Sequence, residues 1–270
     1  VNVPSGYSST MRPLGDSPLV RNDKTIVLAH DHGMEHGPKQ FSGVEERLDP
    51  NEIFEMATHD AVTALAVGKG IAEGYYPSYD DDVNLLAKLN GGSDLWMGDP
   101  YSPHNWSVEY AAELGADAIG YTIYPGVNKE PEMFEDFRPV QEAARDHDLP
   151  IAMWSYPRGQ AVKSHRSKEI IAYAARLGLE LGSDFVKVKY PRSKEAMRYA
   201  VKSAAGNRVL LSGGSKTSDR DFLELVEDCM DVGVAGLAVG RNVWQRENPY
   251  EMLDMLEAVV FEGKSADDVL

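Results

Sequence analysis

The chain has one cysteine among 270 residues and no apolar run long enough to span a membrane. A lone thiol, Cys229, forms no intrachain disulfide, and no second cysteine or nearby histidine suggests a catalytic pair. Its place in a helical pattern predicts a small buried hydrophobe. Residues 1–23 hold no apolar stretch of the kind found in secretion signals. We therefore expect a soluble, cytoplasmic protein with no membrane partner.

Basic residues are also scarce, with 27 Lys and Arg against 43 Asp and Glu and a net charge of −16. Such a surface repels nucleic acid and anionic lipid, so neither is expected as a partner. The acidic residues form short groups, for example at 80–82 and 267–268. Two interpretations stay open. They are solvated faces that keep the protein soluble, or the surface of a halophilic protein whose carboxylates are screened by salt.

Short β-rich runs alternate with helical patterns, without a low-complexity linker or a strong internal repeat. The expected strands are 25–30, 61–67, 94–98, 118–124, 151–156, 185–190, 208–212 and 236–240. The clearest expected helices are 108–114, 132–147, 169–181, 194–204, 219–232 and 249–262. This order predicts an α/β protein, a single-domain (β/α)₈ TIM barrel over 1–270 with an N-terminal extension at 1–23. An open doubly wound sheet is the competing arrangement.

The most informative segment is the run FVKVKY at 185–190. Strand periodicity places Val186 and Val188 on one face and Lys187 and Lys189 on the other. In a barrel the valines suit the helix layer. Both lysines then point inward near the C-terminal end of the strand, where the active sites of this fold lie. Burial and a neighbouring cation lower the pKa of a lysine and favour its nucleophilic neutral form. The alternative is an edge strand with both lysines in solvent.

The first expected strand ends in the sequence AHDHGMEHGP at 29–38. Asp31 shares the strand parity of Val27 and Ala29, so it faces the barrel lumen if they do. Three histidines in seven residues also suggest a metal site. That interpretation needs further ligands at later strand ends, and the other four of the seven histidines fall elsewhere. A metal site is therefore not expected.

Three other strand ends hold candidate chemistry. Trp154 and Tyr156 share a parity at the end of the fifth strand, where a phenol can transfer a proton, although two core aromatics would give the same pattern. The seventh and eighth strands end in LSGGSK (211–216) and VGRN (239–242). Glycines there allow backbone N–H groups to approach an anion, and Arg241 offers a bidentate donor. The sequence therefore predicts a phosphate site, which in this fold commonly follows strands seven and eight.

Taken together, these segments resemble the archaeal-type class I fructose-bisphosphate aldolases over residues 25–262. Each segment alone is a weak signal, but the set is specific. The matching segments are HDHGMEHGP (30–38), KGIAEGYY (69–76), GADAIGYTIYPG (115–126), MWSYPRG (153–159), FVKVKY (185–190), LLSGGSK (210–216) and AVGRNVWQR (238–246).

The resemblance implies that Lys187 forms a Schiff base with the C2 carbonyl of the ketose and that Tyr156 transfers protons. Asp31 and Trp154 are implied as the other active-site residues, with Asp31 orienting substrate hydroxyls and the iminium. The family requires no metal or other cofactor and assembles as homo-oligomers, often decamers. The positions that match those holding the phosphosugar substrate are His32, His36, Arg158, Lys189, Ser212, Gly213, Gly214, Gly240 and Arg241.

One position departs from the pattern, because Ser215 stands where relatives usually have proline. We expect this change to alter phosphate affinity at most.

Two other functions stay open. The first is the related synthase that makes 2-amino-3,7-dideoxy-D-threo-hept-6-ulosonate with the same lysine chemistry, and the second is a phosphosugar-binding barrel without catalysis. The segments MWSYPRG and GYTIYPG favour the aldolase.

Overall fold

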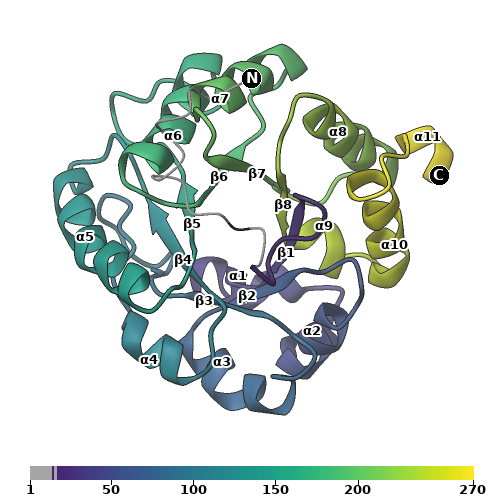
Figure 1. The fold of residues 1–270 in the computed structure, drawn as a ribbon, viewed down its shortest axis with the longest axis horizontal. Helices are drawn as coiled ribbons and strands as arrows, with labels where there is room; N and C mark the ends of the chain where they lie inside the picture. Colours follow the sequence, from purple (N-terminus) through teal and green to yellow (C-terminus); the bar gives the residue numbers. More distant parts are fainter. Residues whose placement is uncertain (1–13, 15–16) are drawn as a thin grey trace.

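The computed structural model describes residue 14 and residues 17–270, and its centre is a closed barrel of eight parallel strands in chain order (Figure 1). The strands are β1 (Thr25–Ala29), β2 (Ala64–Val67), β3 (Leu85–Lys88), β4 (Ala118–Ile123), β5 (Ile151–Ser155), β6 (Phe185–Lys189), β7 (Arg208–Ser212) and β8 (Gly236–Val239). β1 pairs with β8, with Val27 opposite Ala238, so the sheet has no free edge. This closure excludes the open doubly wound sheet and confirms the predicted TIM barrel.

Helices surround the barrel (Figure 1). They are α1 (His32–His36), α2 (Pro50–Ala57), α3 (Lys69–Tyr75), α4 (Val108–Glu113), α5 (Glu130–Asp146), α6 (Lys168–Glu180), α7 (Lys194–Ser203), α8 (Asp219–Asp231), α9 (Arg241–Trp244), α10 (Pro249–Val260) and α11 (Ala266–Val269). Short 3₁₀ turns lie at Pro38–Phe41, Glu45–Leu48 and Tyr76–Ser78. The six helices expected from the sequence correspond to α4 through α8 and α10. Among the described residues no helix is long and apolar enough to cross a bilayer.

Strand periodicity divides the apolar residues into an inner and an outer core. Val27, Ala29 and Phe185 belong to a cluster that fills the lumen. Val186 and Val188 belong to the larger cluster between strands and helices, as does the buried Cys229. Since every strand follows this alternation, the parity that the sequence assigned to β1 and β6 is confirmed.

The predicted position of the third strand was wrong. Residues 94–98 form an exposed turn, where Leu95 is 88% and Met97 is 95% accessible, and the strand is instead β3. β3 is only four residues long and contains Lys88, so its sequence lacks a continuous apolar run. Its period of two becomes clear only in the barrel, where Leu86 joins the inner core. The other seven strands were predicted to within a few residues.

The described part of the predicted N-terminal extension packs against the barrel. Leu14 and Leu19 are buried in the inner core, and the Thr25 hydroxyl donates to the carbonyl of Leu19 at 2.8 Å. Thr25 begins β1, so this segment covers the N-terminal end of the barrel. Residues 1–13 and 15–16 of the extension lie outside the described residues.

Candidate active site

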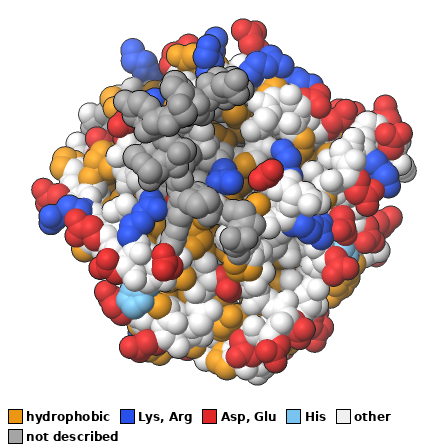
Figure 2. Space-filling view, viewed as in Figure 1, with side chains coloured by type: hydrophobic (Ala, Val, Ile, Leu, Met, Phe, Trp, Pro, Cys, Tyr) orange, Lys and Arg blue, Asp and Glu red, His pale blue; other side chains and the backbone are white. Residues whose placement is uncertain are grey.

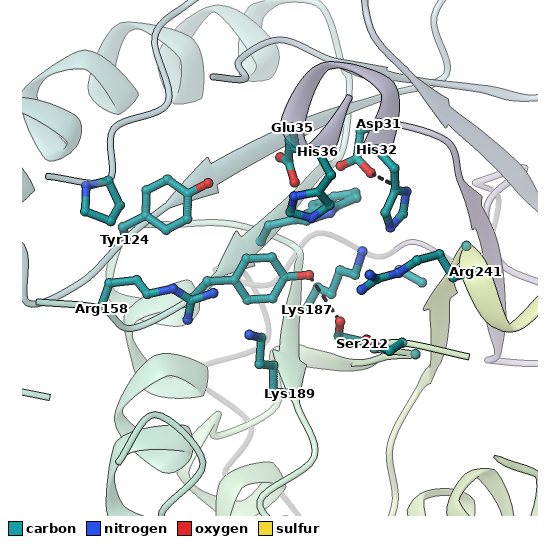
Figure 3. A pocket seen from close by; sticks show the side chains of 18 of the residues that line it. Asp31, His32, Glu35, His36, Tyr124, Arg158, Lys187, Lys189, Ser212 and Arg241 are labelled. Carbon is teal, nitrogen blue, oxygen red and sulfur yellow. Dashed lines mark hydrogen bonds and ion pairs between the residues drawn. The ribbon is translucent and has the colours of Figure 1, made fainter. Parts of the chain in front are cut away.

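A cavity of about 310 Å³ opens at the C-terminal ends of the strands. In this fold the loops at that end build the active site. Figure 3 shows side chains from β6, β7, α9, α1 and its N-cap, and the loops after β4 and β5 converging on it. All thirteen residues that the sequence singled out line this one cavity: Asp31, His32, His36, Trp154, Tyr156, Arg158, Lys187, Lys189, Ser212, Gly213, Gly214, Gly240 and Arg241.

Lys187 lies on the lumen face of β6 and is 4% exposed, which excludes the alternative of a solvated edge strand. Its Nζ is 4.5 Å from the centroid of the Trp154 ring. Burial lowers the pKa of Lys187 to about 8, and the nearby Lys88 adds to this effect while Asp31 opposes it. A usable fraction of neutral amine is therefore present near neutral pH.

Asp31 follows β1 and is the N-cap residue of α1. Burial opposes its ionisation, but the positive charges of His32, Lys187 and Lys88, in decreasing order of effect, prevail and lower the pKa of Asp31 to about 2. His32 is neutral at pH 7, because burial lowers its own pKa to about 3. The cations that keep Asp31 ionised at neutral pH are therefore Lys187 and Lys88, and Asp31 is available as a base.

Tyr156 follows β5, and its hydroxyl is hydrogen-bonded to Ser212 Oγ at 3.2 Å. Burial raises the pKa of Tyr156 well above its ordinary value, although the bond to Ser212 opposes this. The phenol is therefore protonated and can donate a proton into the cavity. Both aromatics predicted at this strand end, Trp154 and Tyr156, face the cavity.

The turn after β7 is held open for an anion. A Cβ on Gly213 would meet Val239 Cγ1 at 3.0 Å, and Gly214 has a φ of +71°. Asn242 fixes this turn, since its side-chain amide donates to the carbonyls of Gly213 at 2.8 Å and Ser215 at 3.0 Å. Backbone groups presented in this way, with Arg241 beside them, suit a phosphate.

A second cationic group lies at the ends of β5 and β6, and consists of Arg158, Arg166 and Lys189. Burial lowers the pKa of Lys189 to about 8, followed by the charges of Arg158 and Arg166. Figure 3 shows Arg158 and Arg241 on opposite sides of Lys187. The cavity therefore has two cationic ends with the reactive amine between them.

Five residues of the cavity or lumen that carry ionisable side chains were not predicted from the sequence: Glu35, Lys88, Asp94, Tyr124 and Arg166. Lys88 is fully buried, and its Nζ donates to the backbone and side-chain oxygens of Asn90. Its signal, a lysine sharing a strand face with an apolar residue, was lost with the misplaced third strand. Glu35 is four residues after Asp31, a helical spacing that could have been recognised. Arg166 lies in an irregular loop without any pattern.

The histidines of the first loop belong to one aromatic cluster, since the His32 ring lies 5.4 Å from the Trp244 ring and 5.9 Å from the His36 ring. His30 packs against Phe41 and Trp244, with ring centroids 5.3 and 5.8 Å away. His36 Nδ1 contacts Asp94 Oδ2 at 2.9 Å. Within the described part of the chain, no three His, Cys, Asp or Glu side chains are grouped as metal ligands would be.

Comparisons with known proteins agree with this geometry. Residues 25–246 match the model of the DeoC/LacD family aldolases. A class 1 fructose-bisphosphate aldolase of Halobacterium salinarum is 62% identical over 260 residues, which is 96% of this chain and 99% of that one. The 2-amino-3,7-dideoxy-D-threo-hept-6-ulosonate synthase 1 of Archaeoglobus fulgidus is 31% identical, covering 94% of this chain and 92% of the synthase.

A solved archaeal fructose-1,6-bisphosphate aldolase, whose catalytic lysine is bound to a carbinolamine intermediate, has 45% identity and a TM-score of 0.85. The match covers 88% of this chain and 94% of that structure. The fold, the cavity and the family model thus agree along the greater part of the sequence. The chain belongs to the DeoC/LacD aldolases and, within them, to the class 1 fructose-bisphosphate aldolases.

Proposed function

We propose that this protein reversibly cleaves fructose 1,6-bisphosphate to dihydroxyacetone phosphate and glyceraldehyde 3-phosphate. The observation that supports this most directly is the position of Lys187, a buried amine between two cationic groups in one cavity. A sugar with a phosphate at each end and a ketone near one of them fits this layout. This fit rests on where the cationic groups lie in the cavity as well as on the size of the cavity.

The chemistry follows from the neutral amine. Lys187 attacks C2, and loss of water from the carbinolamine gives a cationic iminium. When C3–C4 breaks, its electron pair moves toward the iminium nitrogen and forms an enamine, while C4 becomes the aldehyde carbon of glyceraldehyde 3-phosphate. Protonation of C3 and hydrolysis of the iminium then release dihydroxyacetone phosphate and regenerate the amine.

The charges around Lys187 set the orientation of the substrate. Arg241 acts on the pKa of both Lys187 and Lys189, whereas Arg158 and Arg166 act on that of Lys189 alone. The glycine turn with Arg241 is therefore assigned to the phosphate at C1, next to the reacting ketone. The group of Arg158, Arg166 and Lys189 is assigned to the phosphate at C6.

Two side chains divide the proton transfers. Asp31 is anionic and takes the proton of the C4 hydroxyl when C3–C4 breaks. Tyr156 is protonated and donates to the leaving hydroxyl of the carbinolamine and, after regaining a proton from solvent, to C3 of the enamine. This division follows the rule that buried groups with separated pKa values take opposite acid and base roles.

Borohydride trapping tests the proposal. Reduction in the presence of dihydroxyacetone phosphate should attach the three-carbon unit irreversibly to Lys187, and peptide mapping should place it there. Lys187→Met should form no adduct and should lose cleavage. An adduct on another lysine, or full activity of Lys187→Met, would contradict the assignment.

The synthase reaction is the second candidate function, because the same lysine and phosphate sites suit it. The higher identity to the aldolase than to the synthase favours the bisphosphate. Side-by-side assays of bisphosphate cleavage and of fragment transfer separate the two reactions. Substrate binding without turnover or adduct would instead support a binding barrel.

We also propose a homo-oligomer, by resemblance to the family. Sedimentation of the purified protein tests this proposal.

A further inference from the structure

A second cavity, also of about 310 Å³, lies beside the substrate cavity at the ends of β1, β2 and β3. Its floor is buried and includes His30, Lys88 and Asn90, whereas Gly70 and Asn105 at its rim are exposed. It therefore joins solvent to the interior. None of the reaction steps assigned above uses this cavity.

The wall between the two cavities is formed by α1 and its N-cap. Asp31 and Glu35 line both cavities, and their spacing of four residues places them on one face of this short helix. Figure 3 shows both carboxyl groups directed from α1 toward the side chains around Lys187. Asp31 Oδ2 and Glu35 Oε1 are buried without a hydrogen-bond partner. A buried unpaired oxygen is costly unless water reaches it or it has a function.

We propose that Glu35 relays protons between Asp31 in the substrate cavity and solvent in the second cavity. The inference rests on the proposed aldolase reaction and deepens it. That reaction leaves Asp31 protonated after each cleavage, and Asp31 must lose this proton before the next turnover. Glu35 is the titratable residue that shares both cavities with Asp31.

The surroundings of Glu35 suit a group that both gives and takes a proton. Burial and, after it, the charge of Asp31 raise the pKa of Glu35 to about 7, against the opposing charges of Lys88 and Lys187. A carboxyl group with this pKa exists in both forms at neutral pH. The titratable and charged groups that act on it or that it acts on are Asp31, His36, Lys88, Tyr124, Tyr156, Lys187 and Arg241. Asp94 also lines the substrate cavity with Glu35, and His30 and Lys69 line the second cavity with it.

The relay conserves protons and charge. Asp31 takes the C4 hydroxyl proton, and bridging water passes it to one oxygen of Glu35 as the acid proton of Glu35 leaves to water in the second cavity. Asp31 is then anionic again and Glu35 is again protonated. Tyr156 gives one proton when the iminium forms and one to C3, and it regains both from solvent. Glu35 returns one proton to solvent and hydrolysis of the iminium returns the other, so the complete reaction neither consumes nor releases a proton.

The first test replaces Glu35 with an isosteric group that cannot ionise. Because Asp31 must lose its proton before each new turnover, Glu35→Gln should lower the steady-state turnover number for bisphosphate cleavage roughly 100-fold or more, the lower end of the range for loss of a proton-transfer group. The ionisation near pH 7 in the wild-type rate profile should vanish. Borohydride trapping of dihydroxyacetone phosphate should stay intact, since it precedes the relay. Glu55→Gln, the same substitution at an exposed position of α2, is the matched control.

Chemical rescue distinguishes a relay from packing. Glu35→Ala opens space beside the second cavity, so added formate should restore cleavage in proportion to its concentration. An impaired Glu35→Ala variant without rescue would show that Glu35 acts by packing and would overturn the proposal. A Glu35→Gln variant with the wild-type rate and pH profile would overturn it as well. Loss of trapping in the wild type would instead refute the aldolase function itself.

A second variant tests the route without touching Glu35 and decides the matter if Glu35 variants fail to fold. A Cβ on Gly70 at the rim of the second cavity meets no heavy atom within 4 Å, so the position has open space where a side chain begins. Gly70 does not line the substrate cavity. Gly70→Phe should therefore slow cleavage while trapping persists. An unchanged cleavage rate in Gly70→Phe would exclude the second cavity as the proton route.

Discussion

The Lys187 ammonium lies over the indole of Trp154, its partner in the register between β5 and β6, with Nζ 4.5 Å from the ring centroid. Lys88 Nζ approaches the same ring to 5.8 Å. Gly120 leaves room for this arrangement, because a Cβ there would meet Lys88 Cδ at 3.1 Å and Trp154 Cζ3 at 3.3 Å. One aromatic ring thus partly compensates two buried cations. Burial lowers the pKa of Lys187 most, and repulsion from Lys88 lowers it further.

Burying this cation makes Lys187 costly for stability, and the first prediction follows from the sign of its pKa shift. Below about pH 8 Lys187 is charged in both the folded and the unfolded state, so the full desolvation cost applies. Above its ordinary pKa of 10.5 it is neutral in both, and the cost vanishes. Lys187→Met should therefore raise the free energy of unfolding at pH 7 by on the order of 2–3 kcal/mol.

Urea unfolding at fixed salt checks this prediction. The advantage of Lys187→Met should shrink as pH rises from about 8 toward 10.5, since the wild type loses its penalty over that interval. Lys202→Met, at an exposed position on α7, should show no such trend. A Lys187→Met variant less stable than the wild type at pH 7 would mean that the ammonium is well compensated in the fold.

The second prediction concerns the proton donor. Tyr156→Phe keeps the ring but removes the hydroxyl, so kcat for bisphosphate cleavage should fall roughly 100-fold or more while KM changes little. Ser212→Ala keeps the Tyr156 hydroxyl, removes its hydrogen-bond partner at 3.2 Å and should lower kcat by no more than several-fold, with any loss of substrate binding appearing in KM. Steady-state kinetics of both variants decide this. Equal losses of kcat in the two variants would mean that proton donation requires both hydroxyls and not the Tyr156 hydroxyl alone.

Strand parity made much of this site predictable from sequence. Lys187, Trp154 and Asp31 face the lumen because the period of two is reliable wherever a strand is long and flanked by apolar residues. Lys88 was missed for the opposite reason, since β3 is four residues long and the exposed run at 94–98 resembled a strand more closely. Arg166 could not be found, because a loop places its side chains by tertiary contacts that leave no local pattern.

The third prediction assigns the distal phosphate. Arg166→Gln should raise KM for fructose 1,6-bisphosphate roughly tenfold or more, from the loss of one charge-assisted phosphate contact. It should leave borohydride trapping of dihydroxyacetone phosphate unchanged, because that ligand carries only the phosphate assigned to the glycine turn. Arg176→Gln removes an exposed arginine that pairs with Glu180 on α6 and is the control. Impaired trapping in Arg166→Gln would mean that the substrate binds in the opposite orientation, with its C1 phosphate at Arg166.

The fourth prediction decides between the two interpretations of the acidic surface. Acidic side chains are spread around the periphery of the face shown in Figure 2, and the three aspartates at 80–82 are all exposed. With a net charge of −16, repulsion should grow as the screening length rises from about 3 Å at ~1 M salt to about 30 Å at ~0.01 M. We expect unfolding on dialysis into low salt, followed by circular dichroism. Replacing these three aspartates with asparagine should lower the salt needed for folding, whereas full stability of the wild type in low salt would leave the carboxylates a role in solubility alone.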